Sequence, residues 1–341
     1  MRNPMSPVGG AVAAWPPFQR TKRLLPGFLI ALVVALAAAH ISEQYGGPVM
    51  LTALLLGMAF NFLAAEERYA AGLGFSTRAV LKLGVALLGL RITFADIASL
   101  GLTPIMLVLS GLVVTLGTGW GVARALGLSK QFAILTGGAV AICGASAAMA
   151  IAAALPRYAG IERDTIFTVI SVTALSTVAM VVYPLLVPTL GLSDTAAGMF
   201  LGGTIHDVAQ VVGAGYTVSE EAGDVATFTK LLRVALLVPL ISVIVVYSRR
   251  VEGQHSRGLV GVPPFLLGFV GLVVANSVGW VPPGLSATLV EVSRNCLVIA
   301  IAALGVKSSL KELTALGRSA IALVVLETVI LAGFAAGMLA R

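Results

Sequence analysis

Apolar segments follow one another along almost the whole chain, and this feature limits the fold more than any other. A helix that crosses a bilayer needs roughly 20 mostly apolar residues. Only 11% of the 341 residues are charged, whereas soluble domains carry about 25%, so these residues cannot build a water-exposed surface. We expect an all-α membrane protein with about 10–11 transmembrane helices. The candidate segments are 24–41, 48–64, 75–92, 103–125, 131–154, 164–188, 195–215, 224–247, 263–279, 287–306 and 317–340.

Residues 1–23 precede the first apolar segment. They lack the apolar core and small-residue cleavage site of a secretory signal, so we expect a cytoplasmic tail, followed by a single polytopic transmembrane domain over 24–341. The two cysteines, Cys143 and Cys296, lie within apolar runs and show no metal-ligand spacing. We therefore expect no metal site, no cofactor and no disulfide.

Basic residues are distributed unevenly between alternate loops. The net charge of +7 indicates cytoplasmic loops rich in Lys and Arg, rather than a nucleic-acid partner. With the N-terminus inside, the inner segments hold Arg2, Arg20, Lys22, Arg23, Arg68, Arg78, Arg124, Lys130, Arg249, Arg250, Arg257, Lys307, Lys311 and Arg318. The outer segments hold only Arg91, Arg157, Arg163 and Arg341, together with the acidic loop 219–224. This asymmetry predicts a cytoplasmic N-terminus and an external C-terminus.

Two distant stretches of the chain are similar to each other. Residues 85–101 read VALLGLRITFADIASLG, and residues 301–317 read IAALGVKSSLKELTALG. The matched pairs are Gly89 with Gly305, Arg91 with Lys307, Asp96 with Glu312, Gly101 with Gly317 and, upstream, Pro48 with Pro263 and Asn61 with Asn276. Because an odd number of helices separates the copies, we predict an inverted repeat, which is typical of secondary transporters. Chance similarity between two apolar stretches is the alternative.

The stretch 136–147 is unusually rich in glycine for the middle of a membrane helix. It contains Gly137, Gly138 and Gly144, with Cys143 and Ser146 beside them. Glycine weakens a helix by about 1 kcal/mol relative to alanine, so the helix can break here. A half-helix that starts at such a break points its amides and positive dipole at an anion. We predict a substrate-binding segment, with close helix packing as the alternative.

A second stretch, 202–215, places polar side chains at membrane depth. In a continuous helix His206 and Gln210 would share one face, with Thr204 and Asp207 nearby. Ionisable groups inside a membrane are costly and usually functional, and histidine titrates near neutral pH. We predict that His206 and Asp207 couple transport to protons and that Thr204 and Gln210 contact substrate. Backbone bonding by His206 and charge neutralisation by Asp207 are the alternatives.

Two cations follow on the next helix. Lys230 and Arg233 are three residues apart and share a face. Cations at this depth face the bundle interior or an aqueous cavity, and arginine can bind oxyanions through two parallel hydrogen bonds. We predict that both contact an anionic substrate, with an ion pair to Asp207 as the alternative.

Several of these motifs resemble one family. The stretches GGAVAICGASAA at 137–148, GGTIHDVAQVVGAG at 202–215, TKLLRVALLVPL at 229–240 and NCLVIAIAALGV at 295–306 resemble the sulfate exporter family, the YeiH-like bacterial inner-membrane proteins. The resemblance covers the chain from about residue 24. In one departure Asp207 stands where the family often has Glu.

The resemblance implies a relation to cation/proton antiporters and bile-acid transporters. It thus implies inverted repeats, discontinuous helices that cross near the membrane midplane, and sulfate or a similar sulfur oxyanion as substrate. The second repeat is incomplete, because the chain ends soon after residue 317. Either 202–215 supplies its broken segment by permutation, or the repeat alignment is incomplete.

Three functions compete. The leading hypothesis is a proton-coupled exporter of a small inorganic anion, whose partners are that anion, protons and the lipid bilayer, with a homodimer as one assembly. The second is a cation/proton antiporter centred on Asp207. The third, a channel or membrane-embedded enzyme, lacks a nucleophile or phosphate-binding motif in the sequence.

Overall fold

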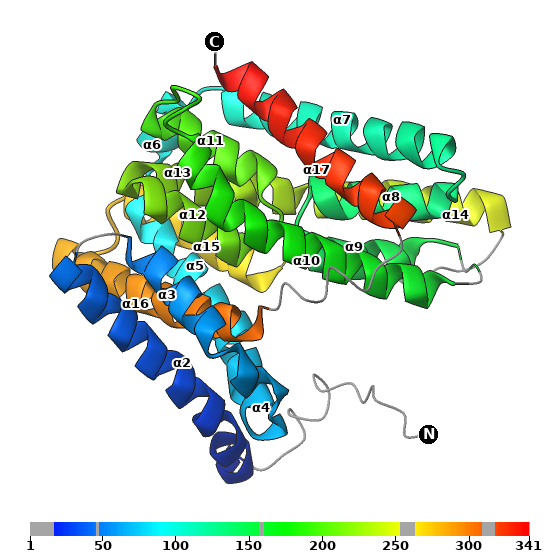
Figure 1. The fold of residues 1–341 in the computed structure, drawn as a ribbon. Coiled ribbons are helices and arrows are strands. Elements are labelled where there is room, and N and C mark those ends of the chain that lie inside the picture. Colours follow the sequence, from blue (N-terminus) through cyan, green and yellow to red (C-terminus); the bar gives the residue numbers. More distant parts are fainter. Residues whose placement is uncertain are drawn as a thin grey trace. The chain divides into compact units, whose positions relative to one another are not determined.

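A computed structural model of the protein describes residues 17–45, 48–156, 158, 160–252, 263–308 and 318–340. Every regular element in these ranges is a helix (Figure 1), which satisfies backbone hydrogen bonds without water. Seven helices in this part of the chain are long and apolar enough to span a bilayer. The prediction of an all-α, multi-pass membrane protein is confirmed.

The chain divides into two compact units. Unit 1 comprises Met1–Gly84 and Glu291–Ser308, and unit 2 comprises Val85–Val290 and Ser309–Arg341. The single transmembrane domain over 24–341 stays a prediction. The first helix, α2 (Pro17–Tyr45), begins within the predicted tail 1–23. Residues 1–16 of that tail lie outside the described part.

Unit 1 is held together by close glycine contacts between helices. Its elements are α2, α3 (Val49–Ala59), η2 (Asn61–Ala65), α4 (Glu67–Phe75), η3 (Ser76–Val80), the first part of α5 (Leu81–Leu87) and the last part of α16 (Pro283–Lys307). A Cβ on Gly27 would lie 2.9 Å from the Cα of Gly72, and one on Gly57 would lie 2.9 Å from the Cα of Gly305. Small residues therefore bring α2 against α4 and α3 against α16, as is common in membranes.

Unit 2 contains the polar segments that the sequence singles out. Its further elements are η4 (Leu88–Arg91), α6 (Phe94–Ser99), α7 (Thr103–Ala125), α8 (Lys130–Ala141), α9 (Ala145–Ala154), α10 (Ile161–Leu186), α11 (Asp194–Thr204), α12 (Val208–Val218), α13 (Glu220–Ala235), α14 (Leu237–Glu252), α15 (Pro264–Ser277) and α17 (Arg318–Leu339). The predicted segments 131–154 and 195–215 are both broken, at 142–144 and 205–207.

The first broken segment folds back on itself. A Cβ on Gly138 of α8 would collide with the Ile151 side chain of α9, although these residues would be about 20 Å apart along one straight helix. The Ser248 hydroxyl near the end of α14 donates to the carbonyl of Ala154, the last residue of α9 (3.0 Å). We name α8 and α9 the first hairpin, with residues 142–144 as its tip.

The second broken segment also reverses. Gly198 on α11 and Gly215 on α12 both pack against the first turns of α13: a Cβ on Gly198 would lie 2.7 Å from the Val225 Cβ, and one on Gly215 would lie 2.8 Å from the Gly223 Cα. We name α11 and α12 the second hairpin, with residues 205–207 as its tip. The predicted breaks are present, but the expectation that each segment crosses the membrane is wrong.

These reversals change which loops share an end of unit 2. The Phe132 ring of α8 contacts the Phe167 ring of α10, with centroids 5.7 Å apart, so Arg163 lies at the same end as Lys130. Thr195 donates to the Glu221 carboxylate at the other end. The predicted placement of Arg163 opposite Lys130 is therefore wrong. Arg163 and Lys130 share one end because the first hairpin returns the chain to the side from which it entered.

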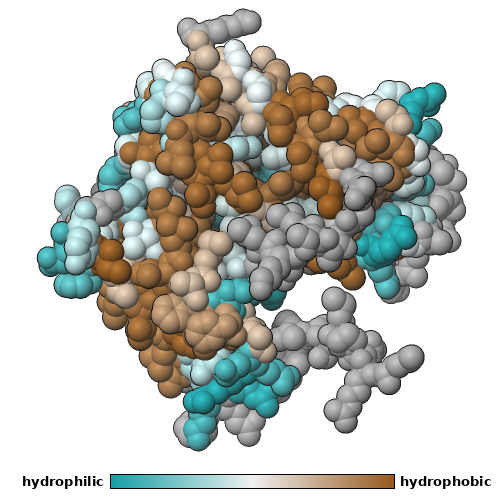
Figure 2. Space-filling model, in the orientation of Figure 1, coloured by the Kyte–Doolittle hydropathy of each residue, from teal (hydrophilic) through white to brown (hydrophobic). Residues whose placement is uncertain are grey.

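Large apolar side chains cover the outer surfaces of the helices, as the brown areas of Figure 2 show. On α2, Leu29, Val33 and Leu36 are exposed, and on α7 Leu109 and Val113 are exposed. Their spacing of three and four residues forms a stripe along each helix. Such stripes suit contact with lipid chains.

Candidate functional site

The tips of the two hairpins touch inside unit 2. Gly144 in the first tip has a φ of +63° and a ψ of −123°, a conformation that side chains other than glycine rarely adopt. A Cβ added there would lie 3.4 Å from the Cβ of His206 in the second tip. Glycine thus provides both the reversal and the close approach.

Two cations of α13 bind the carbonyl groups that the breaks expose. The Lys230 ammonium donates to the carbonyls of Ile142 (2.6 Å) and Ile205 (3.0 Å), one in each tip. Arg233 donates to the carbonyls of Ala141 (2.8 Å), Val140 (2.6 Å), Gly202 (3.1 Å) and Ile205 (3.0 Å). The last carbonyls of a helix lack intrahelical partners, so these bonds satisfy both breaks.

Lys230 and Arg233 therefore hold the two tips together, a structural role that the sequence does not indicate. Both side chains are buried, with 0% and 2% of their surface exposed. In the part of the chain that the structure describes, neither forms an ion pair with Asp207. Their predicted contact with substrate stays a prediction, and such a contact would have to share these donors with the backbone.

The charged side chains at the tips are mostly basic. Each tip holds one helix C-terminus, equivalent to about −0.5 charge, and one N-terminus, equivalent to about +0.5, so the dipoles roughly cancel. The remaining charges are those of the side chains. With their ordinary charges, Lys230 and Arg233 contribute two positive charges, and Asp207 contributes one negative charge. The cations therefore exceed the acids at this point.

The first turns of α9 and α12 differ in their caps. Asp207 caps α12, where its Oδ1 accepts from the Ala209 amide (2.8 Å). The residue before α9 is Gly144, which provides no side-chain cap. Ser146 in the first turn of α9 is exposed, and Asp207 is half-buried. The Cys143 Sγ lies 2.8 Å from the Ser146 Oγ. The first turn of α9 thus has no side-chain cap, and it lies beside an exposed hydroxyl and a buried thiol.

His206 and Gln210 do not share a helix face. Because α12 begins at Val208, His206 lies in the tip before it, so the helical spacing predicted for the pair is wrong. The His206 Nε2 lies 3.0 Å from the hydroxyl of Thr328 on α17, and the Gln210 Nε2 donates to Thr177 on α10 (2.8 Å). The Nδ1 of His206 and the Oε1 of Gln210 are buried without a partner among the described residues.

Three other predicted site residues, Gly137, Gly138 and Thr204, are buried between or within helices. A Cβ on Gly137 would lie 3.4 Å from the Leu116 side chain of α7, and Gly138 packs against Ile151. The buried Thr204 hydroxyl donates back to the Phe200 carbonyl (2.6 Å). The structure therefore places these residues in helix packing, and their predicted substrate contacts stay predictions.

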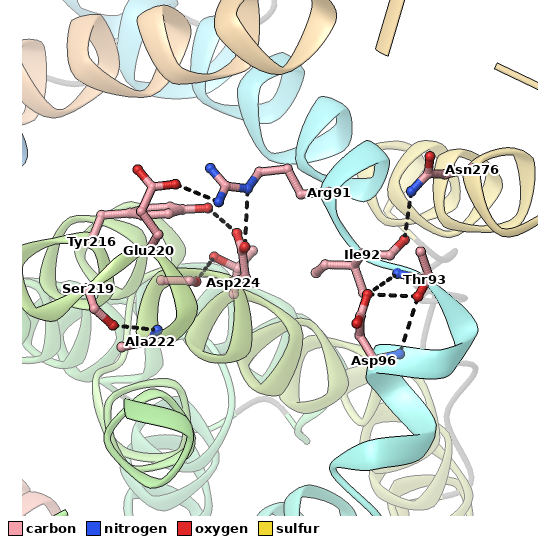
Figure 3. A network of polar contacts seen from close by, with 12 residues as sticks. Arg91, Ile92, Thr93, Asp96, Tyr216, Ser219, Glu220, Ala222, Asp224 and Asn276 are labelled. Carbon is pink, nitrogen blue, oxygen red and sulfur yellow. Dashed lines mark hydrogen bonds and ion pairs between the residues drawn. The ribbon is translucent and has the colours of Figure 1, made fainter. Parts of the chain in front are cut away.

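A second polar cluster lies at the other end of α13 (Figure 3). Arg91 bonds to Glu220 (2.5 Å) and Asp224 (3.1 Å), and the Tyr216 hydroxyl donates to the second oxygen of Asp224 (2.5 Å). Arg91, Asp224 and Glu221 line a pocket of about 470 Å³. We name this end of unit 2 the acidic end. The sequence does not predict that these charged residues are in contact, because 133 positions separate Arg91 from Asp224.

Comparisons with known proteins agree with this membrane architecture. The family model described as conserved hypothetical protein 698 matches residues 23–324. The UPF0324 membrane protein CT0845 of Chlorobaculum tepidum is 50% identical over 316 residues, which cover 92% of this chain and 88% of the relative. The UPF0324 membrane protein TauZ of Paracoccus denitrificans is 51% identical over 313 residues, which cover 91% of this chain and 93% of the relative. The chain belongs to this family, conserved hypothetical protein 698, whose relatives are named UPF0324 membrane proteins.

Proposed function

We propose that the protein is a secondary transporter, and not an enzyme, that exports a small anion across the bacterial inner membrane in exchange for protons. Sulfate or a related sulfur oxyanion is the proposed substrate, and the N-terminus is proposed to be cytoplasmic. The observation that carries this proposal is the meeting of two hairpin tips at Lys230 and Arg233. Broken helices at membrane depth are typical of transporter sites, and the charge excess there is positive.

The anion would bind at the first turn of α9. Its amides have no intrahelical acceptor and no side-chain cap, and Ser146 adds an exposed hydroxyl. A tetrahedral oxyanion accepts several hydrogen bonds at once, which suits such a cluster of donors. The Lys230 and Arg233 charges behind the tip would add attraction without leaving their carbonyl partners.

His206 would carry the coupling proton. The Thr328 hydroxyl has one hydrogen, which it donates to the Val324 carbonyl (2.8 Å), so Nε2 of His206 donates to Thr328 (3.0 Å). In the neutral ring, Nδ1 then has a free lone pair, and it is buried without a partner among the described residues. A proton on this atom would add positive charge beside the proposed anion.

A cation/proton antiporter is the second candidate. The half-buried Asp207 uses Oδ1 for its helix cap, and its second carboxylate oxygen could bind a small cation. In this alternative, Asp207 would exchange a proton for sodium or potassium.

Anion binding to the purified protein in detergent separates these functions. Isothermal titration with sulfate, sulfite, thiosulfate and chloride should show saturable binding of a sulfur oxyanion. Ser146→Ala should weaken binding at least about 10-fold, since a hydrogen bond to a charged group contributes about 1.5–3 kcal/mol. The exposed Ser99, on α6 away from the tips, provides the control Ser99→Ala. Proton release on addition of sodium or potassium, without anion binding, would support the antiporter.

A further inference from the structure

Glu327 is a buried carboxyl group near the middle of α17. Its side chain is 0% exposed. The Oε1 lies 2.9 Å from the hydroxyl of Thr136 on α8, and the Oε2 has no hydrogen-bond partner within the described ranges. No Lys or Arg of that part of the chain forms an ion pair with it.

A bare carboxylate is too costly at this position, because an unpaired charge in an apolar interior loses its hydration. The group must therefore hold a proton or a cation. The described residues contain no cluster of three or more metal-ligating side chains, and hard cations take many more oxygen ligands than one carboxyl and one hydroxyl supply. A proton is the occupant that fits.

The neighbouring hydrogen bonds agree with a protonated carboxyl. Thr136 has a single hydrogen but two acceptors within reach, the Oε1 of Glu327 (2.9 Å) and the carbonyl of Ala133 (3.4 Å). If Oε1 carries a hydrogen, it donates to Thr136, and Thr136 donates onward to Ala133. Both contacts are then satisfied.

Two glycines on neighbouring helices make the space for this group. A Cβ on Gly119 of α7 would lie 2.5 Å from the Oε1 of Glu327, and one on Gly137 of α8 would lie 3.5 Å from it. A methyl group on Gly119 would therefore occupy the place of the carboxyl. Three helices shape the site, and Figure 1 shows α17 running beside α7 and α8.

A pocket lies close to the carboxyl. Trp120, Arg124, Lys130 and Ala133 line a pocket of about 270 Å³, together with Ala123, Gly127 and Leu128. The Ala133 carbonyl also lies 3.2 Å from the position of a Gly119 Cβ. Ala133 therefore borders both this pocket and the Thr136–Glu327 pair.

Other ionisable groups on the helices packed against α17 leave Glu327 without a partner. They are Arg124 on α7, Lys130 on α8, Glu162, Arg163, Asp164 and Tyr183 on α10, and Asp194 on α11. Arg124 and Lys130 are exposed in the pocket. Their positive charges favour release of the proton once water connects the pocket with the carboxyl.

The next residue connects this site with the hairpin tips. The Thr328 hydroxyl lies 3.0 Å from the Nε2 of His206 in the second tip. We propose that Glu327 is a proton-binding site that exchanges its proton with the pocket of Trp120, Arg124 and Lys130, and that α17 transmits its protonation state to the tips through Thr328. The second half of this inference rests on the proposed transport function, whereas the first half does not.

Infrared spectroscopy in lipid vesicles tests the protonated carboxyl directly. At neutral pH the wild-type protein should show a carboxylic acid carbonyl band that is absent from Glu327→Gln. The band should remain in the control Glu291→Gln, which changes an exposed carboxylate. Thr136→Val, similar in shape but without the hydroxyl, should shift the band. Equal bands in wild type and Glu327→Gln would overturn the assignment.

A flux measurement tests the coupling. Since glutamine mimics the protonated acid, Glu327→Gln should retain anion exchange when the pH is equal on both sides of the membrane. The increase in flux caused by a pH gradient should be at least 10-fold smaller than in the wild type. Full stimulation in this variant would overturn the coupling. If the wild type moves no anion, the proposed function fails, while the infrared band still decides the protonation of Glu327.

Discussion

Gly144 shows how much one residue contributes to the proposed site. Its φ of +63° and ψ of −123° belong to a region that is open to glycine, and His206 lies directly beside it. The glycine content of this stretch is visible in the sequence, and it predicts a break. The partner across the break is not predictable, because it is 62 positions away in the sequence and is brought close by the second hairpin.

Gly144→Ala should lower the free energy of unfolding by about 1–3 kcal/mol, because alanine must adopt a strained backbone conformation. Thermal unfolding in detergent measures this loss. Gly117→Ala is the matched control, since Gly117 is in the middle of α7 with open space around it. An unchanged melting temperature in Gly144→Ala would contradict the strained tip.

Arg233→Gln should lower the free energy of unfolding by about 3 kcal/mol or more, because each buried carbonyl group that loses its donor costs about 1–3 kcal/mol. The reason is that Arg233 binds four carbonyl groups. Lysine in its place keeps the charge but not the fork, so Arg233→Lys should recover only part of the loss.

Arg163→Gln provides the comparison for this charge change. Arg163 is 85% exposed and pairs with Asp164, and exposed pairs contribute about 0–1 kcal/mol. Denaturant titration of the three variants gives the difference. A loss no larger for Arg233→Gln than for Arg163→Gln would show that the carbonyl contacts add little.

At the scale of helices, the sequence predicts positions well and directions poorly. The segment 103–125 coincides with α7, and both breaks fall in predicted segments. Length and hydropathy locate apolar helices because lipid imposes them. A half-helix that turns back has the same composition as one that continues, so the two hairpins could not be predicted from these properties.

The acidic end of unit 2 joins η4 to α13 through Arg91. Asp224→Asn should destabilise more than Glu220→Gln, by about 1–3 kcal/mol against about 0–1 kcal/mol. Asp224 binds both Arg91 and Tyr216 and is 21% exposed, whereas Glu220 is 66% exposed. Thermal unfolding of the two variants measures the order, and the reverse order would contradict it.

At the scale of the whole molecule, the predicted inverted repeat relates contacts in the two units. At the spacing that matches Asn61 with Asn276, Leu54 corresponds to Phe269. Gly89 packs against the carbonyl of Phe269 in unit 2, and its repeat partner Gly305 packs against the carbonyl of Leu54 in unit 1. The repeat stays a prediction, because residues 309–317 lie outside the described part.

Gly89→Ala and Gly305→Ala should therefore have similar effects. A Cβ at either position would collide with a backbone carbonyl, and overpacking of this kind costs about 1–3 kcal/mol. Gly271→Ala, at a position with open space around it, should have little effect. Thermal unfolding measures the two losses of stability. Clearly unequal losses for Gly89→Ala and Gly305→Ala would contradict equivalent roles of these glycines.

The distribution of charged residues between the two ends of unit 2 bears on the proposed orientation in the membrane. The first hairpin places Arg163 at the same end of unit 2 as Arg124 and Lys130, so the basic residues of this unit are more segregated than the sequence suggests. The opposite end holds Glu220, Glu221 and Asp224. Under the rule that basic loops face the cytoplasm, the pocket beside Glu327 would open inside.

Transport by the purified protein in liposomes tests whether the protein moves a sulfur oxyanion in exchange for protons. Labelled sulfate, sulfite, thiosulfate and chloride are offered with and without a pH gradient, with empty liposomes and Arg233→Gln as controls. We predict saturable movement of a sulfur oxyanion that rises with the gradient and falls in Arg233→Gln. Absence of anion movement, with proton release on addition of sodium or potassium, would contradict it and make Asp207 the centre of a cation antiporter.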